Sequence, residues 1–277
     1  MIKAIFVLCA ILFLVECKQE IKLDLPNNGQ VLIVQGEIST QKDTSYVKLS
    51  QTVSYYSTDI IPTINNADVR VNGILFKSKG NGIFMPDTPY VGVINTVYNL
   101  IINYNGSTYT SSTLLDEMFD IDRVDSVFYP AGGSGPGGPG AGGPGGGGRK
   151  EGYAVQFFWT DTRTPPKYTY MRIGRTTLEI LQDSFLRNIV LMDNSVTKLN
   201  TQISRELPRH YPHGDTVTAI LKSCDKNMYY FLQAYQMQTS NAPGPFQIPP
   251  ANLPTNIIGG AVGYFSACDV RSFRKGL

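Results

Sequence analysis

Apolar and polar side chains alternate in short runs along the first half of the chain. Residues 31–38 are rich in β-branched side chains. Residues 46–51, 67–71 and 97–104 place an apolar side chain at every second position. Because successive side chains of a strand point to opposite faces, each run predicts a β-strand with one buried face.

Asn-Gly pairs follow two of these runs, at Asn72-Gly73 and at Asn105-Gly106. A type I′ turn needs a positive φ at both central positions, which Asn and Gly adopt readily, so each pair predicts a β-hairpin. Residues 31–115 are therefore expected to form an N-terminal antiparallel β-sandwich domain. Residues 67–112 also resemble small sandwich modules of the immunoglobulin/transthyretin type, which usually bind or act as spacers.

The second half contains further strand-like runs and one segment whose apolar residues follow helical spacing. The runs are residues 153–159, 167–180 and 216–221, with a last strand expected at 261–267. Between them, Met228, Phe231, Leu232 and Tyr235 follow helical spacing behind Asp225, a residue type that caps helices. Residues 116–277 are thus predicted to be a second β-rich domain with one packed helix, and the fold class to be mostly β.

A tract of almost pure Gly and Pro covers residues 131–148. Such a composition buries no core and predicts a disordered or loosely extended segment. The tract is either a linker or a long loop within a domain. The loop is favoured, because residues 125–129 before it and 153–159 after it are both strand-like and could pair as neighbours.

The N-terminus has the pattern of an export signal. Lys3 precedes an apolar stretch, residues 4–15, that is shorter than the ~20 residues of a membrane-spanning helix. Residues 1–16 are therefore interpreted as a signal peptide and excluded from the fold. Leu14 and Cys17 fit a lipobox, whereas Glu16 departs from the small residue usual there. We expect lipidation at Cys17 and a tether over residues 17–30; a plain secretory signal is the alternative.

Two cysteines, Cys224 and Cys268, lie outside the signal and the anchor. An exported protein meets an oxidising compartment, which favours a disulfide between them. If the strand at 261–267 pairs near the strand at 216–221, the two thiols would lie at one sheet edge. The alternative is two separate buried thiols.

Charge and histidine content narrow the chemistry. The net charge is +2 without a basic block, so no nucleic-acid partner is expected. The two histidines, His210 and His213, precede Asp215 and could form part of a metal site. A polar turn at Pro212 to Gly214 is the favoured interpretation, and no metal site and no cofactor are predicted.

Five acidic residues lie close together at the start of the second domain: Asp116, Glu117, Asp120, Asp122 and Asp125. Paired carboxylates serve glycoside hydrolysis, and carboxylate oxygens also bind Ca²⁺. A solvated connector is favoured, because acidic side chains are mostly exposed. No catalytic residue is assigned, and a secreted glycan or peptide hydrolase stays as the alternative function.

Several segments match one family. The closing residues 252–257 and 260–265, the opening residues 21–26 and 34–38, and Tyr229-Tyr230 in the helix resemble a Bacteroidota envelope lipoprotein family catalogued as domain of unknown function 4249. Residues 18–20 also resemble a surface-export tag. The resemblance implies a cell-envelope lipoprotein, often encoded beside TonB-dependent outer-membrane receptors, and no established catalytic residue.

The sequence therefore leads us to expect a non-enzymatic lipoprotein, lipid-anchored to the outer membrane on its cell-surface or periplasmic face. Its expected role is a binding or accessory subunit of a TonB-dependent receptor or of another outer-membrane complex. A structural or adhesive surface module is a further alternative.

Overall fold

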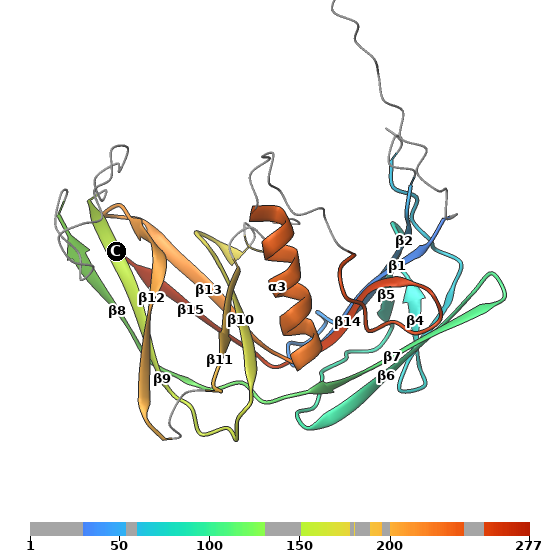
Figure 1. Ribbon diagram of the computed structural model, residues 1–277, viewed down its shortest axis with the longest axis horizontal. Coiled ribbons are helices and arrows are strands. Elements are labelled where there is room, and N and C mark those ends of the chain that lie inside the picture. Colours follow the sequence, from blue (N-terminus) through green and yellow to red (C-terminus); the bar gives the residue numbers. More distant parts are fainter. Residues whose placement is uncertain are drawn as a thin grey trace, which may run out of the picture.

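The computed structural model describes residues 30–53, 60–130, 151–177, 180, 189–195, 200–240 and 252–277. The described residues form an elongated molecule with two β-lobes and a helix, α3 (Lys226–Ser240), between them (Figure 1). The predicted mostly β fold, with antiparallel sheets and one packed helix, is confirmed. No helix in this part of the chain is both long and apolar enough to span a bilayer.

The first lobe is one eight-stranded sheet. Its strands, in spatial order, are β14 (Val262–Cys268), β1 (Leu32–Ser39), β2 (Tyr46–Gln51), β5 (Ile83–Pro86), β4 (Ile74–Ser78), β3 (Asp68–Val71), β6 (Thr96–Tyr104) and β7 (Ser107–Leu115). The sheet curls so that β7, at one end, comes close to the segment that precedes β14, at the other end. Thr110 of β7 and Ile258 of that segment exchange backbone hydrogen bonds of 3.0 and 2.8 Å. The core enclosed in this way includes Val34, Phe76 and Phe265.

The two predicted hairpins of this lobe are confirmed. Asn72 and Gly73 have φ values of 47° and 80° between β3 and β4, and Asn105 and Gly106 have 49° and 76° between β6 and β7. Alternation in β6 buries Leu100 on the core face, as its spacing predicts.

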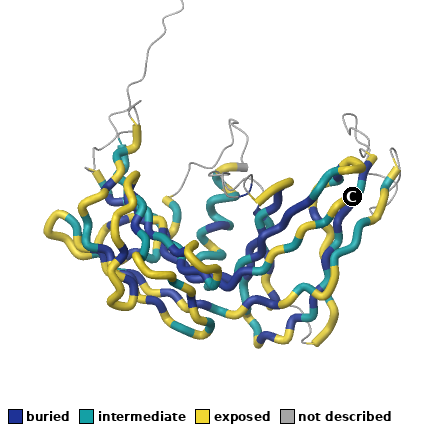
Figure 2. Tube along the Cα trace, turned by 180° about the vertical axis from the view of Figure 1, so that it is seen from behind, coloured by how far each residue is buried: buried dark blue, intermediate teal, exposed yellow. Residues whose placement is uncertain are grey.

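The second lobe packs two sheets face to face. One sheet has the order β11 (Ile189–Asp193), β10 (Tyr168–Gly174), β13 (Thr216–Cys224) and β15 (Val270–Gly276). The other has β12 (Gln202–Tyr211), β9 (Gly152–Thr160) and β8 (Ile121–Tyr129). Phe157, Met171 and Leu221 fill the space between the sheets. Figure 2 shows buried positions running through both lobes, with exposed ones at the strand ends and turns.

The strands that flank the Gly/Pro tract are antiparallel neighbours. Tyr129, two residues before the start of the tract, lies opposite Gly152 in the β8–β9 pair. The tract therefore connects two adjacent strands of one sheet, which confirms its interpretation as a loop within a domain. The tract itself lies outside the described residues, so its predicted disorder stays a prediction.

The C-terminal strand β14 joins the first lobe and pairs in parallel with β1, so a boundary between residues 115 and 116 does not separate the two lobes completely. Two glycines let these strands approach. A Cβ atom at Gly263, whose φ is +108°, would overlap the backbone oxygen of Val34, and one at Gly36 would lie 2.8 Å from the ring of Phe265. Residues 34–38, the part of the opening segments that the structure describes, therefore lie beside the closing strand β14.

Candidate functional site

Buried polar side chains concentrate where the two lobes meet, and we call this region the junction. It contains three groups: Glu37 with Lys222, Asp225 with its donors, and Asp269 with its donors. Each group joins strands of the first lobe to strands or the helix of the second.

The first group is an ion pair between β1 and β13. Nζ of Lys222 lies 2.6 and 2.8 Å from the two carboxylate oxygens of Glu37, and Tyr170 Oη donates to the same carboxylate at 3.3 Å. Burial alone would lower the pKa of Lys222, but the adjacent Glu37 carboxylate raises it above its ordinary value. Burial, together with Glu37, raises the pKa of Tyr46 to about 12. Lys222 is thus held in its charged form.

The second group is built around Asp225, the residue that precedes α3. Its Oδ1 accepts the backbone N–H of Met228 at 2.7 Å, so the predicted helix cap is confirmed. The same carboxylate accepts the hydroxyl of Tyr264 at 2.7 Å and that of Thr113 at 2.8 Å. One side chain therefore fixes the start of the helix to β14 and to β7.

The third group surrounds Asp269, between β14 and β15. Its carboxylate accepts the Met118 N–H at 3.1 Å and the Thr40 hydroxyl at 2.8 Å, and Nη1 of Arg271 lies 2.9 Å away. Arg271 in turn pairs with Asp120 at 2.7 Å. Asp269 is almost fully buried, so these donors offset the cost of removing its charge from water.

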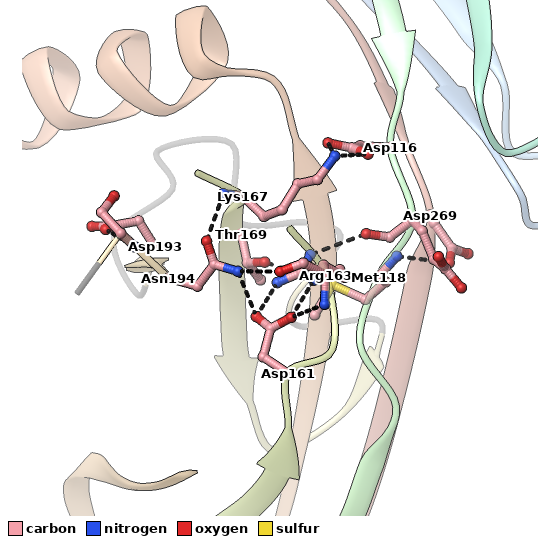
Figure 3. Close-up of polar contacts among 11 residues, drawn as sticks. Asp116, Met118, Asp161, Arg163, Lys167, Thr169, Asp193, Asn194 and Asp269 are labelled. Atoms are coloured by element: carbon pink, nitrogen blue, oxygen red, sulfur yellow. Dashed lines mark hydrogen bonds and ion pairs between the residues drawn. The ribbon is translucent and has the colours of Figure 1, made fainter. Parts of the chain in front are cut away.

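A further buried cluster lies inside the second lobe, beside the junction (Figure 3). Nη2 of Arg163 lies 2.8 Å from the Asp161 carboxylate, which also accepts the Asn194 side-chain N–H at 3.2 Å. Burial would raise the pKa of Asp161, but the hydrogen bonds from Arg163 and Asn194 outweigh it and lower that pKa. Lys167 extends from the same loop to Asp116, at 2.6 Å.

A shallow depression lies beside this cluster. Phe119 and Trp159 line it and stack with their ring centroids 4.9 Å apart, and Arg163 lies 5.0 Å from the Phe119 ring. Asp161, Arg163, Lys167 and Asn194 of the cluster line it, and they bond to one another or, through Lys167, to Asp116. Their arrangement suits the fixing of one segment to another.

A wider depression of about 300 Å³ lies in the first lobe. Tyr90 and Met85 line it together with Asp43, Lys79 and Asp87. The carboxylate of Asp87 pairs with the ammonium groups of Lys77 and Lys79, and hydrogen bonds from both lower its pKa. The lining of this depression therefore combines apolar with charged side chains.

The predicted acidic cluster is divided among separate partners. Asp116 pairs with Lys167, Asp120 with Arg271, and Asp125 with Arg123 at 2.8 Å, while Asp122 accepts the Thr160 hydroxyl at 3.0 Å. The backbone oxygen of Glu117 accepts from Arg163 at 3.0 Å. These carboxylates therefore fasten the lobes and β8, and the structure does not bring them to one shared point.

The two histidines lie near the end of the second lobe. His210 belongs to β12 and stacks on Tyr129 with ring centroids 5.0 Å apart, whereas His213 follows the strand. Gly214 has a φ of +81° and the Asp215 N–H bonds the Pro212 oxygen, which confirms the turn. Within the described ranges, no group of three or more His, Cys, Asp or Glu side chains has the geometry of a metal site.

The predicted disulfide between Cys224 and Cys268 is wrong, since both cysteines are free and buried. Cys268 belongs to a buried cluster with Ile220 and Val270, whereas Cys224 belongs to another with Tyr170 and Leu232 of the helix. Burial raises the pKa of both thiols. Cys17, the predicted lipidation site, lies outside the described residues.

Sequence reasoning missed the junction, apart from the cap at Asp225. Glu37 stands in a β-branched run and Lys222 ends an alternating one, where apolar side chains would be expected. An acidic residue in one largely apolar strand and a basic residue in another indicate that the two could form an ion pair in the interior. This signal does not identify which strands come together.

Comparison with known proteins gives one result. The chain belongs to the family described as Domain of unknown function (DUF4249), whose family model matches residues 18–274. A search of curated proteins and a search of solved structures found no match.

Proposed function

We propose that this family member is a non-enzymatic lipoprotein of the outer membrane that serves as a binding or accessory subunit of a larger complex. Its partner would be an outer-membrane protein, such as a TonB-dependent receptor. The lipid on Cys17 would hold the chain at the cell surface or at the periplasmic face, without a membrane-spanning segment.

The observation that carries the proposal is the way the buried charges are used. Glu37, Asp161, Asp225 and Asp269 each accept a hydrogen bond from a residue far away in the sequence, and these bonds hold distant segments together. Such side chains make a rigid two-lobed body, which is what a subunit needs to present a fixed surface to a partner. The lipobox-like residues Leu14 and Cys17 support the location.

The anchor is tested by replacing one cysteine at a time. Cys17→Ala should move the chain from the membrane fraction to the soluble fraction, because each acyl CH₂ contributes about 0.8 kcal/mol to membrane binding. Cys9→Ala is the matched control, since Cys9 is expected to leave with the signal, and it should stay membrane-bound. A wild-type chain without acyl mass on Cys17 would contradict the lipoprotein proposal.

The partner is tested by cross-linking in native membranes followed by mass spectrometry of the captured complex. Repeated recovery of one outer-membrane receptor, lost with Cys17→Ala, is the expected result. A wild-type chain that is acylated but always recovered alone would contradict the role as a subunit.

A further inference from the structure

One end of the first lobe carries a rim whose described residues are largely apolar. The register places Val262 beside Ile33, Ile33 beside Ser50, and Ser50 beside Thr63. In the next row, the Thr52 N–H bonds the Val31 oxygen at 2.9 Å, and Ile61 precedes Pro62, whose oxygen accepts the Gln51 N–H at 3.0 Å. We call Val31, Ile33, Ile60, Ile61 and Val262 the apolar rim.

Three side chains of the apolar rim face solvent. Ile60 is 93% exposed, Ile61 55% and Val262 41%, while Val31 and Ile33 are half-buried. Their described neighbours in these two rows, Ser50, Thr52 and Thr63, are uncharged. Isolated apolar side chains on a surface are ordinary, but five beside uncharged neighbours at one sheet end form a contact surface.

The apolar rim lies where the predicted tether joins the folded body. Val31 belongs to the rim, and 30 − 17 = 13 residues separate Cys17 from Gln30, the first described residue. A chain of this length spans at most about 45 Å when fully extended. An acyl chain on Cys17 would therefore hold this end of the first lobe within about 45 Å of the bilayer.

We infer that the apolar rim rests on the lipid bilayer, with Ile60 and Ile61 placed in the region of the headgroups and upper acyl chains. This inference rests on the proposed lipoprotein function and adds an orientation to it. Apolar side chains are suited to that interface, because the acyl anchor supplies the affinity and the rim only sets the angle.

The opposite end of β1 offers a matched control. The Gly92 N–H bonds the backbone oxygen of Ser39, the last residue of β1, at 2.7 Å, so Val93 lies at the far end of the strand from Val31. Val93 is 62% exposed, as apolar as a rim residue and similarly open to solvent. In the inferred orientation Val93 stays in water.

The test uses an environment-sensitive fluorophore on an introduced thiol. Cys224 and Cys268 are buried and Cys17 would be acylated, so Ile60→Cys or Val93→Cys can be labelled selectively in the native full-length chain. The labelled lipoprotein is placed in phosphatidylcholine vesicles with or without nitroxide-bearing lipids. We expect a blue shift and loss of fluorescence for the label at position 60, and neither change at position 93.

A second variant and two further outcomes separate the rim contact from the proposed function. Adding Ile61→Asp to the Ile60→Cys chain should remove the quenching while leaving the chain on the vesicles. An acylated, vesicle-bound chain whose label at position 60 is not quenched would overturn the rim contact and point to a protein partner at this end. A chain with no acyl mass and no vesicle binding would instead overturn the proposed function.

Discussion

The two lobes differ in what their interiors contain. The fully buried polar residues among β1 to β7 are Ser39, Ser45, Ser111 and Thr113, all uncharged, and Glu37 at the junction keeps 14% of its side chain exposed. The fully buried charged residues Asp161, Arg163 and Asp269 come from the later part of the chain. The first lobe is held by an apolar core inside one curled sheet. The second lobe and the junction depend in addition on side-chain pairs between distant segments. Substitutions in the two places should therefore fail in different ways.

The largest effect is expected from the apolar core of the first lobe. Phe265 of β14 is fully buried in the core of the first lobe, and Phe265→Ala should lower the free energy of unfolding by about 3–5 kcal/mol. Urea unfolding followed by circular dichroism measures the loss. Phe128→Ala is the control, because Phe128 is half exposed. Equal losses in both variants would contradict the assignment of Phe265 to the core.

Breaking the junction should cost somewhat less. Lys222→Met leaves the Glu37 carboxylate buried without its cation, which should lower the free energy of unfolding by about 3 kcal/mol. The unfolding curve should also split into two steps, since the lobes would no longer unfold together. Adding Glu37→Gln should recover part of the loss. A single transition at wild-type stability would show that the pair does not couple the lobes.

The buried cluster in the second lobe should make stability depend on pH. Asp161 has a lowered pKa in the folded chain. Its contribution is therefore fully present above the unfolded pKa of about 3.9, and it is lost as the pH falls through the lower folded pKa. The melting temperature of the wild type should fall faster than that of Asp161→Asn below about pH 4. If the melting temperatures of the wild type and of Asp161→Asn fall equally with pH, the Asp161 cluster is not a source of acid sensitivity.

The smallest effect is expected from the Gly/Pro tract. Replacing residues 131–148 by a short turn should change the free energy of unfolding by less than about 1 kcal/mol, because loop-closure entropy varies slowly with length. The β8–β9 pairing at Tyr129 and Gly152 should hold without it. Calorimetry of the shortened chain checks this, and a loss of several kcal/mol would show that the tract packs in an ordered way.

Local signals predicted much more of the fold than long-range ones. Asn72-Gly73 and Asn105-Gly106 specify a turn between adjacent residues, so both hairpins follow from the sequence. Asp225 is also a local signal, because it caps the helix that begins at the next residue. β11 and β12 were not anticipated; β12 contains Pro208 and an irregular register between Glu206 and His210, which obscure its alternation.

The pairing of β14 with β1 could not be predicted, because nothing in either strand alone identifies the other. The error at Cys268 follows from it, since a strand expected beside β13 lies beside β1. The junction was missed for the same reason. Glu37 and Lys222 become partners only after two sheets have been placed against each other.

The parallel pairing of β1 with β14 also bears on how the chain matures. The first strand to leave a ribosome or an export channel must wait for one of the last strands before its sheet can close. Contacts between such distant segments form slowly, because a long loop has to be closed first. A chain cut short before Val262 would lack the strand that covers Val34 and would expose apolar core to proteases and chaperones. The closing strand thereby couples survival of the folded protein to completion of its synthesis.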